Sequence, residues 1–364
     1  MTDTAVVITE YATQGSARIV EATLNSPKSL NALTSAMIEI LMRKLPVWDA
    51  DQDVVAIIIK GAGERAFCAG GDIRDLYAAM AHENQHFGQQ FFNLEYSLDM
   101  MLHNLNTPLL VWGNGYVMGG GMGIYQAADI RVVTPSSRLA MPEISIGLYP
   151  DVGASLFLQK VPHKLGLFLG LTGAMVNATD ACRLQLADVQ LAEQSYASLV
   201  AGLQQWHSAT ERDFRGFMQT VVADLSNTNT EAPESDIDEL WDDLVVTMNA
   251  GDLLAIYHGL NDMQGRSKWL DKAINTMRKG SPTSLHLAYR QLQQPVASWY
   301  DAFMQEYYIA VNATKLGEFQ EGIRALLIDK DGTPAWRYAS IAEVPAKWID
   351  RFYDQQAIVL PDYA

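Results

Sequence analysis

The stretch that decides the fold is GNGYVMGGGMG, residues 113–123, together with the apolar run LLVW that precedes it at residues 109–112. A short apolar run of this kind is typical of a buried strand. Three adjacent glycines have no side chains to pack, so they favour a place where the backbone approaches another group closely. The residues from 124 to 128 have helical composition. We therefore expect a strand, a glycine turn and then a helix that begins within the glycines.

A helix that begins in the glycine run would have a chemical consequence. Its first N–H groups lack acceptors within the helix, and the positive end of its dipole faces the same place. An oxygen atom that gains negative charge would be stabilised there, because one such donor lowers a barrier by roughly 2.7–4 kcal/mol. The alternative is a tight turn with close helix–strand packing and no ligand. A dinucleotide-binding loop is a weaker interpretation, since Gly113, Gly115 and Gly119 miss the G-x-G-x-x-G spacing by one residue.

A second glycine-rich loop occupies residues 61–72 and follows the apolar, β-branched run at residues 54–59. That run indicates a strand covered on both faces. Open α/β sheets bind ligands where strands give way to helices. The backbone N–H of Gly71 could therefore face a ligand as well. Gly71 could equally be a plain loop glycine, with Asp72 capping the next helix.

The order of the expected elements predicts an α/β fold. Strands are expected at residues 6–10 and 17–24, then a helix capped by Thr34, then the strand at 54–59, which together form a βαβ unit. One long helical segment is expected at residues 75–105, a strand at 130–134 and a helix at 165–171. From about residue 180 the pattern is mainly helical. We divide the chain into an α/β core, residues 1–200, and a helical C-terminal region, residues 201–364.

Composition excludes several classes of function. The formal charge is −16, from 26 basic and 42 acidic residues, which argues against a nucleic-acid partner. No apolar run reaches about 18 residues, so we expect no membrane span. Cys68 and Cys182 provide no disulfide framework, which fits a reducing compartment, and we expect the cytoplasm. His82 and His86 could share a helical face, but the sequence shows no third ligand, so we expect no metal.

Three short motifs carry a family resemblance. At residues 66–72 (AFCAGGD) and 115–121 (GYVMGGG) the chain resembles the enoyl-CoA hydratase/isomerase superfamily, which has the crotonase fold. Residues 24–33 (LNSPKSLNAL) look like that family too. The resemblance implies a ClpP-like spiral of ββα turns, followed by a helical C-terminal region that forms trimer contacts in many members. Finer features resemble the 3-hydroxyisobutyryl-CoA hydrolase branch, at residues 141–143, 146–153, 281–285 and 321–331.

The resemblance also assigns roles to individual residues. The N–H groups of Gly71 and Gly120 would polarise the thioester carbonyl of an acyl-CoA substrate. Glu143 would activate a water molecule or attack that carbonyl itself, and Asp151 would bind the hydroxyl of the acyl group. Glu95 sits in an apolar stretch, where an acid usually lies on a solvated face. The resemblance instead gives Glu95 a place in the substrate site. No cofactor is implied, because coenzyme A is part of the substrate.

One departure separates the branches of the superfamily. A typical hydratase has a second glutamate just after the triple glycine, where this chain has Gly123. A single glutamate does not easily run a hydration that uses two carboxylates. The resemblance therefore favours hydrolysis of 3-hydroxyisobutyryl-CoA, a step of valine degradation. An enoyl-CoA hydratase or isomerase is the first alternative, and a relative that binds acyl-CoA without catalysis is the second.

Overall fold

The chain forms two compact units that are interleaved along the sequence. A computed structural model describes residues 5–81, 85–207, 213–226, 231–316 and 318–355. The first unit comprises Met1–Gly71, Met101–Leu139 and Val176–Ser235, and the second comprises Asp72–Met100, Ala140–Met175 and Asp236–Ala364. These units are defined by packing, so the functional division expected at residue 200 stays a prediction.

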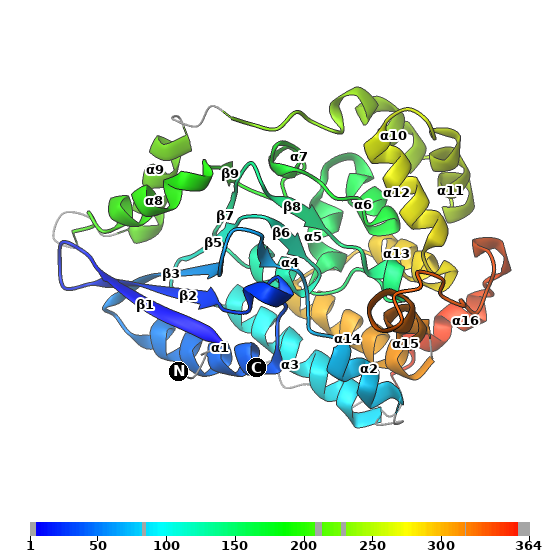
Figure 1. Ribbon diagram of the computed structural model, residues 1–364, viewed down its shortest axis with the longest axis horizontal. Coiled ribbons are helices and arrows are strands. Elements are labelled where there is room, and N and C mark those ends of the chain that lie inside the picture. Colours follow the sequence, from blue (N-terminus) through cyan, green and yellow to red (C-terminus); the bar gives the residue numbers. More distant parts are fainter. Residues whose placement is uncertain (1–4, 82–84, 208–212, 227–230, 317, 356–364) are drawn as a thin grey trace. The chain divides into compact units, whose positions relative to one another are not determined.

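The first unit is built on a six-stranded sheet with the strand order β1-β2-β3-β5-β7-β9 (Figure 1). The β1–β2 pair is antiparallel, and each of the other neighbouring pairs is parallel. The strands are β1 Val6–Ala12, β2 Arg18–Leu24, β3 Val54–Gly61, β5 Leu109–Gly113, β7 Ile130–Val133 and β9 Val189–Gln190. The expected strands at residues 6–10, 17–24, 54–59, 109–112 and 130–134 are confirmed.

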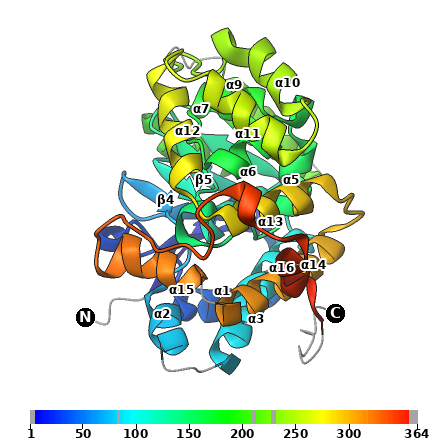
Figure 2. The same ribbon diagram turned by 90° about the vertical axis from the view of Figure 1, so that its right-hand side faces the viewer.

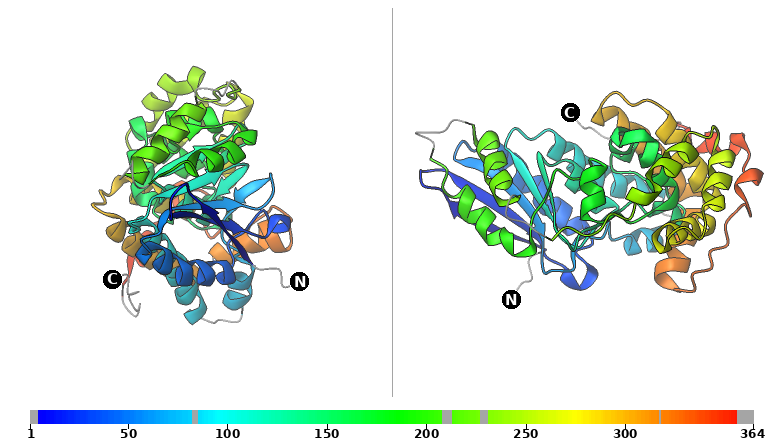
Figure 3. Two further views of the ribbon diagram at one scale, coloured as in Figure 1. Left: turned by 90° about the vertical axis from the view of Figure 1, so that its left-hand side faces the viewer. Right: turned by 90° about the horizontal axis from the view of Figure 1, so that it is seen from above.

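Helices cover both faces of this sheet, which explains the continuous apolar runs of its central strands. Ile58, Leu110 and Val132 share one core with side chains of α8 (Tyr196–Leu203) and α9 (Phe214–Ser226). On the opposite side α1 (Ser35–Ala50) runs along the strands (Figure 3). Thr34 caps α1 as expected, because its side chain accepts a hydrogen bond from the N–H of Met37 at 3.3 Å.

A small second sheet carries the glycine loops. Its order is β4-β6-β8, with β4 Ala66–Cys68, β6 Tyr116–Met118 and β8 Arg138–Ala140. Helix α4, Gly120–Gln126, starts two residues after β6. The expected strand, glycine turn and helix are therefore confirmed. The remaining helix of the first unit is α7, Ala178–Arg183.

The second unit is helical in its described residues, with α10 and α12 packed on α6 and α11 packed on α10 (Figure 2). Its helices are α2 Arg74–Ala81, α3 Gln85–His103 (whose last three residues belong to the first unit), α5 Ala154–Lys160, α6 Leu165–Thr172, α10 Trp241–Met248, α11 Leu253–Asp262, α12 Lys268–Lys279, α13 Pro282–Gln293, α14 Trp299–Leu316, α15 Glu318–Ile323 and α16 Ala346–Asp350. The expected helix at residues 165–171 is confirmed. The helical segment expected at residues 75–105 is confirmed over α2 and α3, and residues 82–84 between these helices lie outside the described residues.

Two expected absences concern membranes and metals. Across the described ranges, no helix has the length and apolar character that crossing a lipid bilayer requires. Among the same residues, no group of three or more acidic, histidine or cysteine side chains is arranged to hold a metal ion. His82 lies outside the described residues, and the side chain of His86 is not described, so the pair weighed as a zinc site is not placed.

Candidate active site

The two glycine loops of the sequence motifs meet in the first unit. Gly70 has a φ of +107°, and a Cβ atom there would lie 3.5 Å from the carbonyl oxygen of Met118 and 3.9 Å from the nitrogen of Gly120. Gly120 is the first residue of α4, so its N–H is one of those that a helix leaves without an internal acceptor. The loop that contains Gly71 thus lies against the start of α4. That the two amides serve one oxyanion stays a prediction.

Different physical constraints require glycine at Gly119 and at Gly121 of the triple run. Gly119 has a φ of 49°, a conformation that favours glycine, and forms the turn before α4. A Cβ atom on Gly121 would lie 2.5 Å from the carbonyl oxygen of Cys68, so only glycine lets α4 pack directly on β4. Close helix–strand packing, the alternative left open above, therefore accounts for Gly121. That the N–H of Gly120, at the start of α4, serves a ligand stays a prediction.

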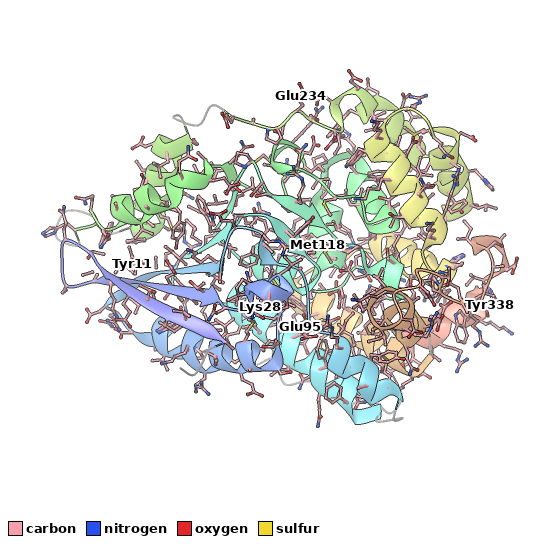
Figure 4. All side chains as sticks on the ribbon, in the orientation of Figure 1. Tyr11, Lys28, Glu95, Met118, Glu234 and Tyr338 are labelled. Atoms are coloured by element: carbon pink, nitrogen blue, oxygen red, sulfur yellow. The ribbon has the colours of Figure 1, made fainter. Side chains whose placement is uncertain are left out.

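A cluster of buried acids forms in the second unit. It consists of Glu95 and Asp99 on α3, Glu143 at the start of a 3₁₀ turn (η2, Glu143–Ile146), Asp151 just before α5, and Glu306 on α14. All five side chains are buried. Figure 4 labels Glu95, one of the two members that lie on α3. Buried acids are rare unless they are paired, so a cluster of five indicates a site rather than a core.

Tyr96 holds Asp151. The hydroxyl of Tyr96 donates a hydrogen bond of 2.7 Å to Oδ2 of Asp151, and the tyrosine is fully buried. Burial raises the pKa of Asp151 to about 6, while the hydrogen bond from Tyr96 acts in the opposite direction. Glu95, which the resemblance places in the substrate site, precedes this tyrosine directly in sequence, and the charge of Asp151 acts on it.

Glu143 has one carboxylate oxygen without a partner. Its Oε2 is buried and accepts no hydrogen bond from the described residues. Burial, and then the charge of Asp151, raises the pKa of Glu143 well above its ordinary value. An oxygen atom that is both desolvated and unbonded is available to attack a substrate or to take a proton from water.

Glu95 is buried rather than solvated. Only 4% of its surface is exposed, so the general expectation for an acid in an apolar stretch is wrong here. Burial, and then the charge of Asp151, raises the pKa of Glu95 to about 8. Below that pH the side chain holds a proton and can donate a hydrogen bond, which Asp151 in its ionised form cannot do.

Sequence reasoning did not identify Asp99 and Glu306. Asp99 is four residues after Glu95 and so lies on the same face of α3, which was an available signal. Both of its carboxylate oxygens are buried without partners among the described residues. Glu306 has apolar residues on its own helical face, Ala302, Phe303, Ile309 and Ala310. That pattern marks a buried acid but does not indicate what it binds.

The branch-specific motifs hold the turn that carries Glu143. The backbone of Gly322 on α15 packs directly on Ile146, and that of Gly147 packs on Glu318, with no room for a Cβ atom at either glycine. At the start of α13, the N–H of Ser281 donates a hydrogen bond of 3.0 Å to the carbonyl of Ile144. Residues far apart in sequence thus fix the backbone on both sides of this turn.

Comparison with known proteins extends the resemblance to the whole chain. The family model for enoyl-CoA hydratase/isomerase matches residues 19–353. A 3-hydroxyisobutyryl-CoA hydrolase of Danio rerio is 36% identical over 332 residues, which are 91% of this chain and 86% of that protein. The human protein of the same name is 35% identical and covers 88% of this chain and 82% of its own.

These relatives correct one expectation. Their names place them in the mitochondrion, so the expectation of a cytoplasmic protein is wrong. The inference from cysteine content failed because two cysteines without a disulfide are compatible with any reducing compartment and do not distinguish the cytoplasm from the mitochondrion.

Solved structures confirm the predicted fold class. An enoyl-CoA hydratase from Rhodobacter sphaeroides 2.4.1 has a TM-score of 0.82 and 32% identity, and the match covers 96% of this chain and 97% of that one. A carnitinyl-CoA dehydratase from Mycobacterium thermoresistibile has the same TM-score at 28% identity and covers 96% of each chain. By its sequence and its fold, the chain belongs to the enoyl-CoA hydratase/isomerase family, the crotonase superfamily.

Proposed function

We propose that this protein hydrolyses the thioester of 3-hydroxyisobutyryl-CoA, giving 3-hydroxyisobutyrate and coenzyme A, as a step of valine degradation. The observation that carries the proposal is the match, over nearly the full length of both chains, to relatives that bear this name. Gly123 supports it, because the second carboxylate of a hydratase is missing from α4. The buried acids of the second unit supply the groups that hydrolysis needs.

The proposed roles follow the chemistry of each group. The amides of Gly71 and Gly120 polarise the thioester oxygen as negative charge develops on it. The acid Glu143, with its unbonded oxygen, delivers the attack. The hydroxyl of the acyl group donates a hydrogen bond to Asp151 and accepts one from protonated Glu95, so that both of its hydrogen-bonding capacities are satisfied. The coenzyme A thiolate is the leaving group.

Two chemical routes remain for Glu143, and labelled water separates them. As a nucleophile, Glu143 forms a mixed anhydride with the acyl group, and water then opens this anhydride. As a general base, it removes a proton from the attacking water. After turnover in H₂¹⁸O, mass spectrometry of the protein finds ¹⁸O in the Glu143 carboxylate for the first route only, provided that water attacks the glutamyl carbon.

The test of the proposed function is release of free thiol from three substrates. We expect rapid release from 3-hydroxyisobutyryl-CoA and much slower release from isobutyryl-CoA, which lacks the hydroxyl. A site built to bind that hydroxyl discriminates by a factor on the order of 10⁴. Crotonyl-CoA is included because the similar solved structures are named as a hydratase and a dehydratase. Hydration of crotonyl-CoA without thiol release would support the first alternative, and binding without any reaction would support the second.

A further inference from the structure

A strained turn follows Asp151 in the second unit. Val152 has a φ of +53° and Gly153 a φ of +87°. A β-branched residue at positive φ is a clear outlier, and such residues cost on the order of 1–3 kcal/mol each. Backbone of this kind persists only where its surroundings fix it. The structure must therefore hold this turn from outside.

Glu306 provides that hold from α14. Its Oε2 accepts a hydrogen bond of 2.7 Å from the N–H of Gly153. Its Oε1 accepts one of 2.8 Å from the N–H of Ser155 and one of 2.6 Å from the Ser155 hydroxyl. Its backbone carbonyl accepts a hydrogen bond from the hydroxyl of Tyr149. A single residue thus fixes the chain two positions before Asp151 and two positions after it.

The chemistry of this hold is specific to a carboxylate. Three donors converge on the side chain of Glu306, which is fully buried. Burial raises the pKa of Glu306 to about 8, although the hydrogen bonds from Ser155 and Gly153 act in the opposite direction, so the ionised form that accepts all three bonds prevails above that pH. A glutamine of the same size has one acceptor oxygen and one NH₂ group, so it would turn a donor toward at least one of these donors.

We propose that Glu306 is a positioning residue, which orients the carboxylate of Asp151 toward the hydroxyl of the acyl group. The inference rests on the proposed function, because it assigns Asp151 to that hydroxyl. Glu306 acts through the backbone of the turn and does not itself touch substrate. A third anchor lies between the other two, since Nε2 of Gln291 donates a hydrogen bond of 2.6 Å to the carbonyl of Pro150.

A purely structural role makes a different prediction. Glu306 would then only stabilise the fold at the start of α5, and its loss would lower the hydrolysis of every acyl-CoA alike. The deciding quantity is therefore a ratio, that of kcat/KM for 3-hydroxyisobutyryl-CoA to kcat/KM for isobutyryl-CoA. This ratio is independent of the fraction of protein that is folded.

The experiment measures this ratio in Glu306→Gln, Asp151→Asn and the double variant. We expect Glu306→Gln to lower the ratio by about 10- to 100-fold, since a displacement of about 1 Å has effects of that size. In the Asp151→Asn background we expect no further fall, because the two residues act through one contact. The matched control is Glu21→Gln, a buried acid on β2 of the first unit that should leave the ratio unchanged. An unchanged ratio in Glu306→Gln, or a fall that adds to that of Asp151→Asn, would overturn the proposal.

A second measurement does not depend on activity. Hydrogen–deuterium exchange of peptides that cover residues 148–158 should be faster in Glu306→Gln than in the wild type, with no change in α13. Ser155→Ala removes one of the three donors, so it should change the ratio and the exchange rate in the same direction as Glu306→Gln but by less. If Glu306→Gln does not fold, the result with Ser155→Ala tests the role of Glu306. Failure of the wild type to release thiol overturns the proposed function alone. Unchanged exchange in the variants overturns the role of Glu306.

Discussion

At the scale of single residues, Glu143 and Asp151 differ in how their oxygens are used. Asp151 accepts a hydrogen bond from Tyr96, whereas Oε2 of Glu143 has no partner among the described residues. The bonded acid is suited to hold a substrate group in place, and the unbonded one is suited to react. Because the charge of Asp151 raises the pKa of Glu143 and of Glu95, the titration of these acids belongs to the cluster rather than to any one residue.

This coupling predicts a shift in the pH profile of Asp151→Asn. Glu143 must be ionised to attack or to accept a proton, so kcat/KM rises with pH as Glu143 loses its proton. The charge of Asp151 raises the pKa of Glu143, and its removal should move the rising limb to lower pH. The measurement is kcat/KM against pH with isobutyryl-CoA, so that loss of hydroxyl binding does not interfere. The exposed acid Asp301 supplies the control, Asp301→Asn, and a limb that stays in place in Asp151→Asn contradicts the assignment.

The sequence predicted the proposed reacting residues, Glu143 and Asp151, better than the residues that hold their backbone in place. Glu143 and Asp151 lie in short local motifs, so a resemblance can find them. Glu306 is about 150 residues from the turn that it holds, and its partners are mainly backbone N–H groups, which any residue type supplies. Nothing in the local pattern around Glu306 can therefore indicate its partner.

At the scale of elements, glycine-mediated contact places the turn that carries Glu143. The backbone of Gly322 packs directly on Ile146 at the end of η2. Added volume in such a contact displaces backbone, because no flexible side chain can move away. This contact gives a physical reason why the motif at residues 321–331, which resembles one branch of the family, contains a glycine at position 322.

Gly322→Ala should therefore impair catalysis and stability together. Overpacking of this kind costs about 1–3 kcal/mol, and we expect turnover of all acyl-CoA substrates to fall as η2 moves. The control is Gly216→Ala on α9, where a Cβ atom would meet only the side chain of Asp213. The urea midpoint and the rate of thiol release measure the two effects. Wild-type values of both in Gly322→Ala would show that the contact is not needed.

The elements found from sequence were those with a simple pattern. The apolar run at residues 54–59 and the glycine run at 119–121 were placed correctly, since a doubly covered strand and a close helix–strand contact each restrict composition. The helical composition of residues 75–105 likewise agrees with the described helices α2 and α3. The close packing of α15 on η2 depends on tertiary contact, which no local window contains.

At the scale of the whole molecule, the buried acids impose a pH dependence on stability. Burial, and then the charge of Glu95, raises the pKa of Asp99 well above its ordinary value. Below about pH 4, Asp99 is protonated in both the folded and the unfolded chain. As the pH rises, the unfolded chain releases this proton first, so the free energy of unfolding falls by about 1.36 kcal/mol per pH unit for such a group.

Asp99→Asn should reduce this decline, because asparagine does not titrate. We expect the urea midpoint of the variant to rise relative to that of the wild type as the pH increases from about 4 to about 7. The range begins at the ordinary aspartate pKa of about 3.9, because the folded chain retains the proton above that pH. The exposed Asp224 on α9 supplies the matched control, Asp224→Asn. If the gap between Asp99→Asn and the wild type does not widen with pH, then Asp99 does not retain its proton in the folded state.

The measurement that tests the central claim most directly is thiol release from 3-hydroxyisobutyryl-CoA by Glu143→Gln. We predict that the variant binds coenzyme A like the wild type and loses at least about 10³-fold in kcat, since it lacks the group that delivers the attack. Wild-type turnover by Glu143→Gln would contradict this role, because hydrolysis would then proceed without the Glu143 carboxylate, whose Oε2 accepts no hydrogen bond from the described residues.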